Sequence, residues 1–162
     1  MRAQACIWYG GRVSSPPSAP VAQADAGACA ALLAAGERLA RAVEAELQAR
    51  HRIGLRGLEV LDRLAAAPAG AGVRITGLLE CARLSQSRMS RLVAELETRG
   101  LVSRASCPAD ARGVEVAITD RGMLTLGEAR RTHREALHER VLARLEPDEL
   151  AALGRIVAKL LD

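Results

Sequence analysis

The chain of 162 residues carries a net charge of +4, is 49% hydrophobic and contains only two aromatic residues, Trp8 and Tyr9. This length suits one domain, and a core without Phe must be built from Leu, Val, Ile and Ala, which favours helices over a β-sandwich. We expect neither a membrane span nor a secretory signal peptide, and four scattered cysteines without a Cys-x-x-Cys pair argue against a disulfide framework or a cysteine-rich zinc site.

Residues 1–28 differ in composition from the rest of the chain. The stretch SSPPSAP at 14–20 cannot form a regular helix, because consecutive prolines remove backbone donors and clash with the preceding turn. We therefore assign residues 1–28 to a Pro/Ser-rich arm, which is either disordered or anchored through Trp8 and Tyr9. Residues 29–162 form the domain itself.

Two amphipathic helices are predicted before residue 70. Between residues 29 and 50 apolar residues recur at helical spacing, among them Leu32, Leu39 and Val43. A turn near residues 51–54 leads into a second helix, which stops before the breaker PAGAG at 68–72.

Residues 73–100 have the pattern of a helix-turn-helix. After a short extended piece at 73–75, Thr76 and Ser85 are suited to cap two short helices, and Gly100 is suited to end the second. Two helices joined by so short a turn resemble the motif that places its second helix in the DNA major groove.

The second of these helices separates an apolar stripe from a polar end. Its polar residues near the N-terminal end are Ser85, Gln86, Ser87, Arg88, Ser90 and Arg91. Arg88 can pair with guanine and Gln86 with adenine, while Ser87 and Arg91 suit phosphate or mixed contacts. The alternative is a solvated helix face. Residues 83–112 hold six Arg against three acidic residues, which favours a polyanionic partner.

A β-hairpin is predicted directly after this helix. Residues 101–106 and 113–118 are two short extended runs separated by CPADAR. Arg112 at the hairpin tip could enter a minor groove, with Asp110 orienting it, and the alternative is a solvated loop charge. A long helix from Thr119–Asp120 to about Leu145 and a last helix after Pro147 complete the chain.

The segments SRLVAELETRGLVSR (90–104) and PADARGVEVAITDRG (108–122) resemble the MarR family of bacterial winged-helix regulators. The positions that carry the resemblance are Leu96, Glu97, Gly100, Leu101, Val102, Arg104, Asp110, Arg112, Ile118, Thr119 and Gly122. The resemblance extends over roughly residues 29–162. It departs at Ala111 and Ala105, where the family often has basic residues, which implies a weaker grip of the wing on DNA.

The resemblance implies a mainly α fold with a small β-hairpin, in which a winged helix-turn-helix region (about 55–118) joins dimerisation helices (about 29–50 and 120–162). It implies a cytoplasmic transcriptional regulator without a cofactor, a repressor that binds a pseudo-palindromic operator in double-stranded DNA as a homodimer. An unidentified small-molecule effector would release it. Arg104 is carried over as a further DNA contact. We expect no enzymatic activity, because no catalytic arrangement of side chains matches a motif.

Two alternatives remain open from the sequence. One is a thiol-based redox sensor, because hydroperoxide-sensing members of the family place a reactive cysteine near the position of Cys29. Those members surround it with tyrosines, whereas here Tyr9 in the arm is the only one, so the residues favour an unreactive thiol. Cys107 is a second redox candidate. The other is a protein-interaction module that has lost DNA binding. The three histidines are too dispersed to predict a metal site.

Overall fold

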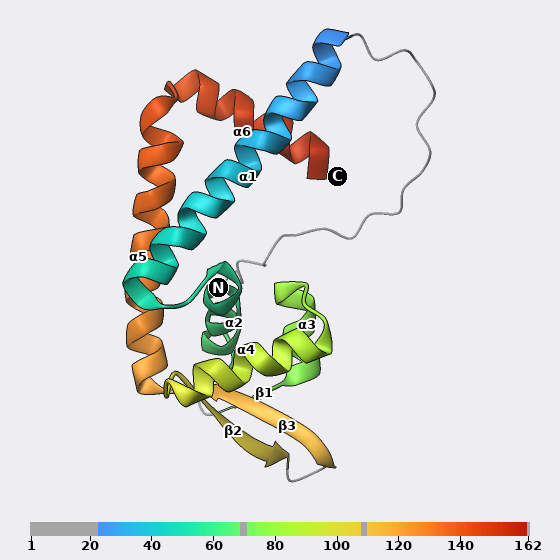
Figure 1. Cartoon of the computed structure of the whole chain (residues 1–162), viewed down its shortest axis with the longest axis vertical. Coiled ribbons are helices and arrows are strands. Elements are labelled where there is room, and N and C mark those ends of the chain that lie inside the picture. Colours follow the sequence, from blue (N-terminus) through green and yellow to red (C-terminus); the bar gives the residue numbers. More distant parts are fainter. Residues whose placement is uncertain (1–22, 69–70, 108–109, 162) are drawn as a thin grey trace. The chain divides into compact units, whose positions relative to one another are not determined.

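The computed structural model describes the backbone of residues 23–68, 71–107 and 110–161, and for residues 23–25, 80, 106, 107 and 110–113 the backbone alone. In chain order the elements are α1 (Gln23–His51), α2 (Leu55–Ala65), β1 (Val73–Arg74), α3 (Ile75–Ala82), α4 (Gln86–Thr98), β2 (Val102–Cys107), β3 (Asp110–Ile118), α5 (Asp120–Arg140), the 3-10 turn η1 (Leu142–Arg144) and α6 (Pro147–Leu161) (Figure 1). The prediction of a mainly helical chain with a small antiparallel sheet is confirmed. None of the helices within these ranges is both long enough and apolar enough to cross a bilayer.

The chain divides into two compact units. One comprises residues 43–136 and holds all the buried side chains of the described residues, and the other comprises the described residues 23–42 and 137–161. Fully buried residues of the first unit come from helices α1 to α5, from β3 and from the turn between α4 and β2, and include Leu47, Leu61, Leu78, Met89, Leu96, Leu101, Val116 and Leu126. Each such aliphatic side chain contributes about 1.5–3 kcal/mol when it leaves water. The core therefore lies around the helix-turn-helix and the sheet.

The sheet has three antiparallel strands in the order β1-β3-β2, and Figure 1 labels them. The sequence predicts the β2–β3 hairpin, but it does not predict that the short piece β1 pairs with β3 through Val73 and Val116. The hairpin is also tighter at its end than expected. Cys107 pairs with Asp110, so residues 111–113 form an irregular insertion within β3 and not part of an open loop.

Helix α4 ends in the manner that the sequence predicts. Gly100 has φ +68°, a left-handed conformation that costs glycine little. Its amide donates to Glu97 O at 2.8 Å, and the amide of Leu101 donates to Leu96 O at 2.9 Å. This pair of hydrogen bonds is a Schellman motif, and it turns the chain from α4 directly into β2.

The N-terminus of α2 is capped by a residue of α1. Gly54 holds the N-cap position and has no side chain to offer. In its place Glu44 Oε2 accepts a hydrogen bond from the amide of Leu55 at 2.6 Å. A carboxylate at this end of a helix also compensates the positive end of the helix dipole.

Two helix boundaries differ from the prediction. Helix α1 begins at Gln23, inside the segment that the sequence assigns to the arm, because the Ala-rich residues 23–28 follow the last proline and have good helix propensity. Helix α5 ends at Arg140 and not near Leu145. Val141 leaves the helical region with φ −126° and ψ −64°, and the chain is extended at Leu145, shortly before Pro147.

Three local expectations require correction or qualification. Thr76 is not the cap of α3, because that helix begins at Ile75 directly after β1, with Arg74 at the cap position. Ser85 does occupy the N-cap of α4, but its hydroxyl makes no capping hydrogen bond. Val43, which the sequence places on a dimer-facing stripe, is buried in the core of the chain's own unit 43–136.

Candidate nucleic-acid interface

A three-residue turn joins α3 to α4. Arg83 adopts the left-handed conformation (φ 49°, ψ 42°), which costs a non-glycine residue about 1–2 kcal/mol. The buried residues Leu78 and Ala82 of α3, together with Met89 of α4, hold the two helices against the core. The turn therefore fixes the angle between α3 and α4, which is what a helix-turn-helix requires.

Helix α4 has one buried face and one exposed face. Met89, Val93 and Leu96 are almost completely buried, at the spacing of four and three residues that keeps them on one side of the helix. Ser85, Gln86, Ser87, Arg88 and Arg91 are exposed, and Ser90 is half-buried. The helix-turn-helix thus brings all six predicted residues of this segment to one end of α4, with five of them open to solvent.

Arg88 and Arg91 are the exposed cations of this face. Neither guanidinium has a hydrogen-bond or ion-pair partner among the residues that the structure describes. Each therefore keeps its full set of donors free for a carboxylate, a phosphate or a base edge. Nearby, the hydroxyls of Ser85 and Ser87 lie 3.3 Å apart.

The charges of α4 run against the helix dipole. The first turn holds Arg88 and no acidic residue, whereas Glu95 and Glu97 lie toward the C-terminal end, where the last turn holds no basic residue. Acidic groups stabilise helix N-termini and basic groups stabilise C-termini, so this order contributes no stability to α4. Arg88 therefore lies where a cation does not favour its own helix.

Arg104 is held against α4. Its Nε lies 3.1 Å from Glu97 Oε2, and its Nη2 donates to Ser90 O at 3.4 Å. The Nε atom is buried, and the Glu97 contact lacks the geometry of a hydrogen bond, so we regard it as an ion pair alone. These contacts tie β2 to α4. The DNA contact expected of Arg104 stays a prediction, and it would use what remains free of the guanidinium.

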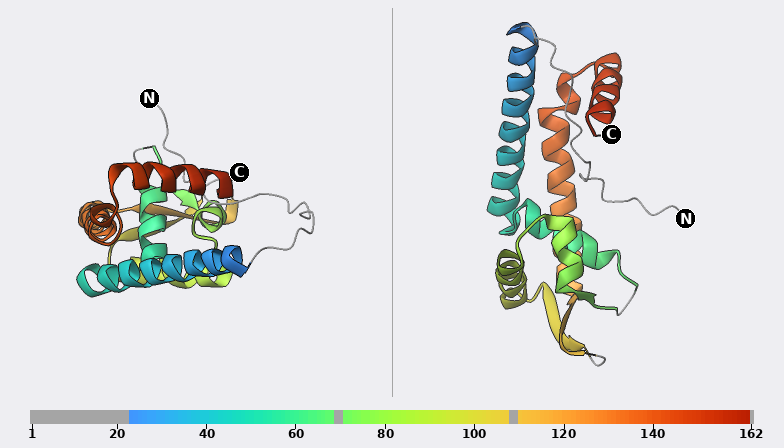
Figure 2. Two further views of the ribbon diagram at one scale, coloured as in Figure 1. Left: turned by 90° about the horizontal axis from the view of Figure 1, so that it is seen from above. Right: turned by 90° about the vertical axis from the view of Figure 1, so that its right-hand side faces the viewer.

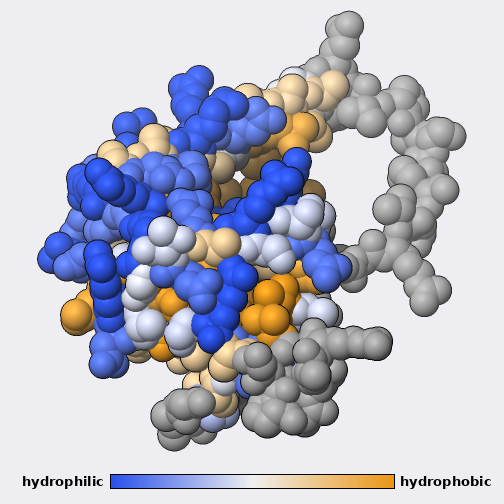
Figure 3. All heavy atoms as spheres, turned by 60° about the horizontal axis from the view of Figure 1, so that its bottom comes forward, coloured by the Kyte–Doolittle hydropathy of each residue, from blue (hydrophilic) through white to orange (hydrophobic). Residues whose placement is uncertain are grey.

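The far end of the hairpin carries the remaining predicted DNA contacts. Asp110 and Arg112 belong to β3, and Arg112 lies in the irregular insertion beside the turn. Their side chains lie outside the described part of the chain, as does that of Cys107. Figure 2 shows β2 and β3 extending together away from α3 and α4, and on the coloured part of Figure 3 hydrophilic and hydrophobic side chains alternate on this face.

The thiols and histidines form no second centre within the described ranges. Cys29 is exposed on α1, and the Sγ of Cys81 donates to Leu78 O at 3.1 Å. No group of three or more His, Cys, Asp or Glu side chains in residues 23–68, 71–107 and 110–161 is placed to hold a metal ion. Cys6 lies outside these ranges.

Sequence reasoning missed two residues that organise this region, Glu44 and Arg99. Glu44 caps α2 across a gap of eleven residues. Arg99 reaches from the end of α4 to the last carbonyls of α1. The sequence holds no signal for either contact, because both join a side chain to a backbone group of another helix.

Comparison with known proteins agrees with this architecture. Residues 58–113 match the model of the MarR family. An uncharacterized HTH-type transcriptional regulator of Mycobacterium bovis is 35% identical over 82 residues, which are 49% of this chain and 57% of that protein. The match thus spans little more than half the length of the curated relative.

Solved structures extend the likeness to most of the chain. Sco3205 of Streptomyces coelicolor, a MarR family transcriptional regulator solved in complex with DNA, has a TM-score of 0.75 and 28% identity, covering 88% of this chain and 89% of that one. AbsC, another MarR family regulator of S. coelicolor, has a TM-score of 0.73 at 22% identity and covers 88% and 95% of the two chains. With its helix-turn-helix and the β2–β3 wing, the chain is similar to MarR family regulators, whose family model matches residues 58–113.

Proposed function

We propose that this protein is a DNA-binding transcriptional regulator that places the N-terminal end of α4 in the major groove of duplex DNA. One observation carries the proposal: Arg88 and Arg91 are exposed, have no partner among the described residues, and Arg88 lies in the first turn of α4, where a cation does not favour the helix. An N-terminal end with free guanidinium forks and hydroxyls suits both base edges and phosphates. The solved DNA complex of Sco3205, which is 28% identical, supports the same use of this fold.

The proposal includes a homodimer. Apolar side chains outside the core are exposed on two helices, with Leu33 at 71%, Ile156 at 53% and Leu160 at 55%. None of the residues of α6 is buried, although the helix is strongly amphipathic. A second copy of the chain would cover these faces, and it would present two copies of α4 to half-sites about 34 Å apart on a pseudo-palindromic operator.

Repression in the cytoplasm, with release by a small-molecule effector, completes the proposal. These points rest on the similarity of the chain to the MarR family. They fit the dimer, since an effector that changes the spacing of the two α4 helices would change how well both half-sites are met at once.

Selection from a random pool of DNA duplexes tests the proposal. The full-length protein should enrich a pseudo-palindromic duplex, and its affinity, measured by fluorescence anisotropy, should fall steeply as salt rises, because bound Lys and Arg release counterions from the phosphates. Arg88→Ala and Arg91→Ala should weaken binding. Arg134→Ala removes the same charge from an exposed residue of α5 and should bind as the parent does. Enrichment of no duplex would contradict the proposal and favour the alternative of a protein-interaction module without DNA binding.

A further inference from the structure

The C-terminus of α1 ends in an uncommon way. Its last residue, His51, is followed by Arg52, which has φ +53° and whose amide donates to Gln48 O at 2.9 Å. Glycine is the usual residue at such a position, because side chains are disfavoured there. The final carbonyls of a helix have no partner within the helix, so an arginine in this conformation needs support from elsewhere.

Arg99 supplies that support from the end of α4. Its Nη2 donates to His51 O at 2.6 Å, and its Nη1 donates to Arg52 O. The two donors of one planar guanidinium thus hold two consecutive carbonyls, at the negative end of the α1 dipole. We call this contact the Arg99 clamp. Its partners are distant in the sequence: Arg99 lies 47 positions after Arg52 and 48 positions after His51.

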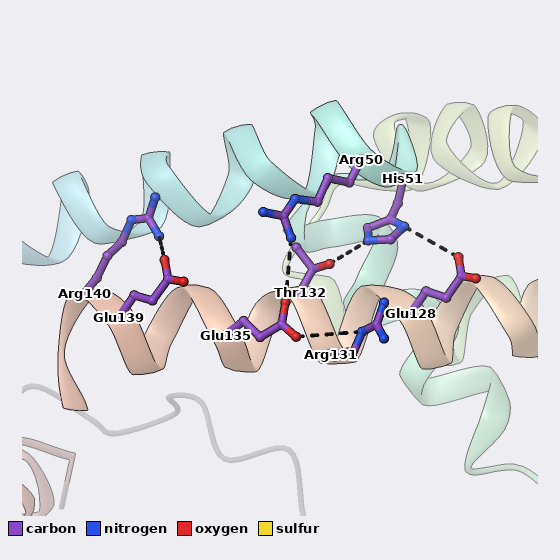
Figure 4. Close-up of polar contacts among 8 residues, drawn as sticks. All are labelled: Arg50, His51, Glu128, Arg131, Thr132, Glu135, Glu139 and Arg140. Atoms are coloured by element: carbon purple, nitrogen blue, oxygen red, sulfur yellow. Dashed lines mark hydrogen bonds and ion pairs between the residues drawn. The ribbon is translucent and has the colours of Figure 1, made fainter. Parts of the chain in front are cut away.

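The side chain of His51 extends the connection to a third helix. Its Nε2 lies 2.8 Å from Thr132 Oγ1 of α5, and the Thr132 side chain is buried. Its Nδ1 lies 4.0 Å from Glu128 Oε2. Figure 4 shows the His51 ring turned toward these two residues. The end of α1 is therefore held to α5 through the His51 ring and to the C-cap of α4, Arg99, through two carbonyls.

We propose that Arg99 is a positioning residue for DNA recognition, fixing the C-terminal end of α4 to the junction of α1 and α5 and so setting how α4 presents Arg88 and Arg91. This inference rests on the proposed function. Arg99 follows Arg88 by eleven residues, about 16 Å along a helix. Its Nη donors are engaged by protein carbonyls, so it acts on DNA through the placement of α4. Met89, Val93 and Leu96 bury the helix without it, so α4 should persist when the clamp is lost.

Three variants of the full-length protein test the role. Arg99→Gln removes the charge, and Arg99→Lys keeps the charge but not the planar fork. Arg130→Gln is the matched control, because Arg130 also joins two helices, with its Nε 2.6 Å from Asp62 Oδ1, but it does not touch α4. Each is titrated by anisotropy against the enriched duplex at several salt concentrations, and its thermal unfolding is recorded.

Both Arg99 variants should weaken specific binding by about 2–30-fold, as expected for loss of a coupling contact remote from the ligand. The slope of log Kd against log salt should stay that of the parent, because no phosphate contact is lost. Arg130→Gln should bind as the parent does, even if its melting temperature falls as far. Hydrogen exchange of the free protein should show faster exchange of the Arg52 amide in both Arg99 variants.

The outcomes separate this inference from the proposed function. If Arg99→Lys binds as tightly as the parent, charge alone suffices and the positioning role is wrong. A salt slope shallower by about one in Arg99→Gln would instead make Arg99 a phosphate contact. If the Arg52 amide exchanges at the parent rate in both Arg99 variants, the clamp does not stabilise the end of α1. If the parent enriches no duplex, both the proposed function and the positioning role are wrong. The hydrogen-exchange rate of the Arg52 amide would then still show whether Arg99 stabilises the end of α1.

Discussion

The hydroxyl of Thr119 donates a hydrogen bond to the carbonyl of Gly100 at 2.7 Å and accepts one from the amide of Gly122 at 3.0 Å. One side chain thus caps the N-terminus of α5 and ties it to the turn that follows α4. The amide of Thr119 also donates to Leu101 O at 3.1 Å. The start of α5 and the end of α4 are therefore joined at the base of the hairpin.

Thr119→Val should lower the free energy of unfolding by about 1–2 kcal/mol, since it keeps the shape and removes both hydroxyl contacts. Urea denaturation measures this. Thr98→Val is the control, because the Thr98 hydroxyl bonds only to Ala94 O on an exposed helix turn. Equal losses in the two variants would contradict a special role for Thr119.

Gly122→Ala should destabilise the protein by about 1–3 kcal/mol, because a Cβ there would collide with the backbone carbonyl of Leu101. Gly127→Ala, one and a half turns later on the same helix, has nothing within 4 Å of its Cβ and should stabilise by about 1 kcal/mol. Opposite signs in thermal unfolding are the expected result. A Gly122→Ala variant as stable as the parent would mean that the backbone there can move apart.

The free protein should sediment as a dimer, and Leu160→Asp should raise the dimer dissociation constant at least about tenfold by placing a charge in the apolar face of α6. Leu124→Asp changes a residue of α5 that is at least as exposed, and it should leave the dimer intact. A parent protein that is a stable monomer at micromolar concentration contradicts the dimer, whatever the variants do.

Arg112→Ala should weaken operator binding by about 1–3 kcal/mol if the wing enters the minor groove, with the largest loss on sites with narrow, A/T-rich flanks. Arg88→Ala should instead reduce discrimination among base pairs within the half-site. Anisotropy on one operator and on variants changed only in the flanks separates the two. If the Arg112→Ala protein binds every operator variant as tightly as the parent does, the arginine of the wing is a solvated charge and not a DNA contact.

Cys29→Ser should leave both DNA binding and its response to peroxide unchanged, because the chain has a single tyrosine, Tyr9, and so lacks a group of tyrosines that could lower the pKa of the thiol. Exposure of Cys29 makes the test practicable, since an oxidant can reach the sulfur. Peroxide-sensitive binding that disappears in this variant would establish the redox alternative.

The sequence predicts best those parts of the fold whose signal is local. The stripe of Met89, Val93 and Leu96 and the turn at Gly100 follow from helical periodicity and from the backbone freedom of glycine, and both are confirmed. The predicted end of α5 near Leu145 is wrong, because nothing in the residues near Val141 indicates a break in the helix. The prediction that Thr76 caps α3 is wrong, because β1 pairs with β3 as far as Arg74 and α3 begins directly after it, at Ile75.

The candidate interface divides in the same way. Exposure of Arg88 and Arg91 follows from their place opposite the apolar stripe, so the sequence suffices to find them. The engagement of Arg104 by Glu97 requires β2 to lie beside α4, and the Arg99 clamp requires the end of α1 to lie beside the end of α4. These contacts depend on the tertiary fold, and the spacing of residues along the chain does not predict them.

The capping of α2 by Glu44 bears on how this protein can be divided. A fragment limited to the predicted DNA-binding region, residues 55–118, would begin at the amide that Glu44 satisfies and would leave that helix end bare. It would also lose the buried Val43 and Leu47 of α1 and Leu126 of α5. The smallest autonomous piece must therefore start before Val43 and run past Leu126. The predicted DNA-binding region of this protein therefore depends on its flanking helices, and residues 55–118 should not be transferred to another scaffold without them.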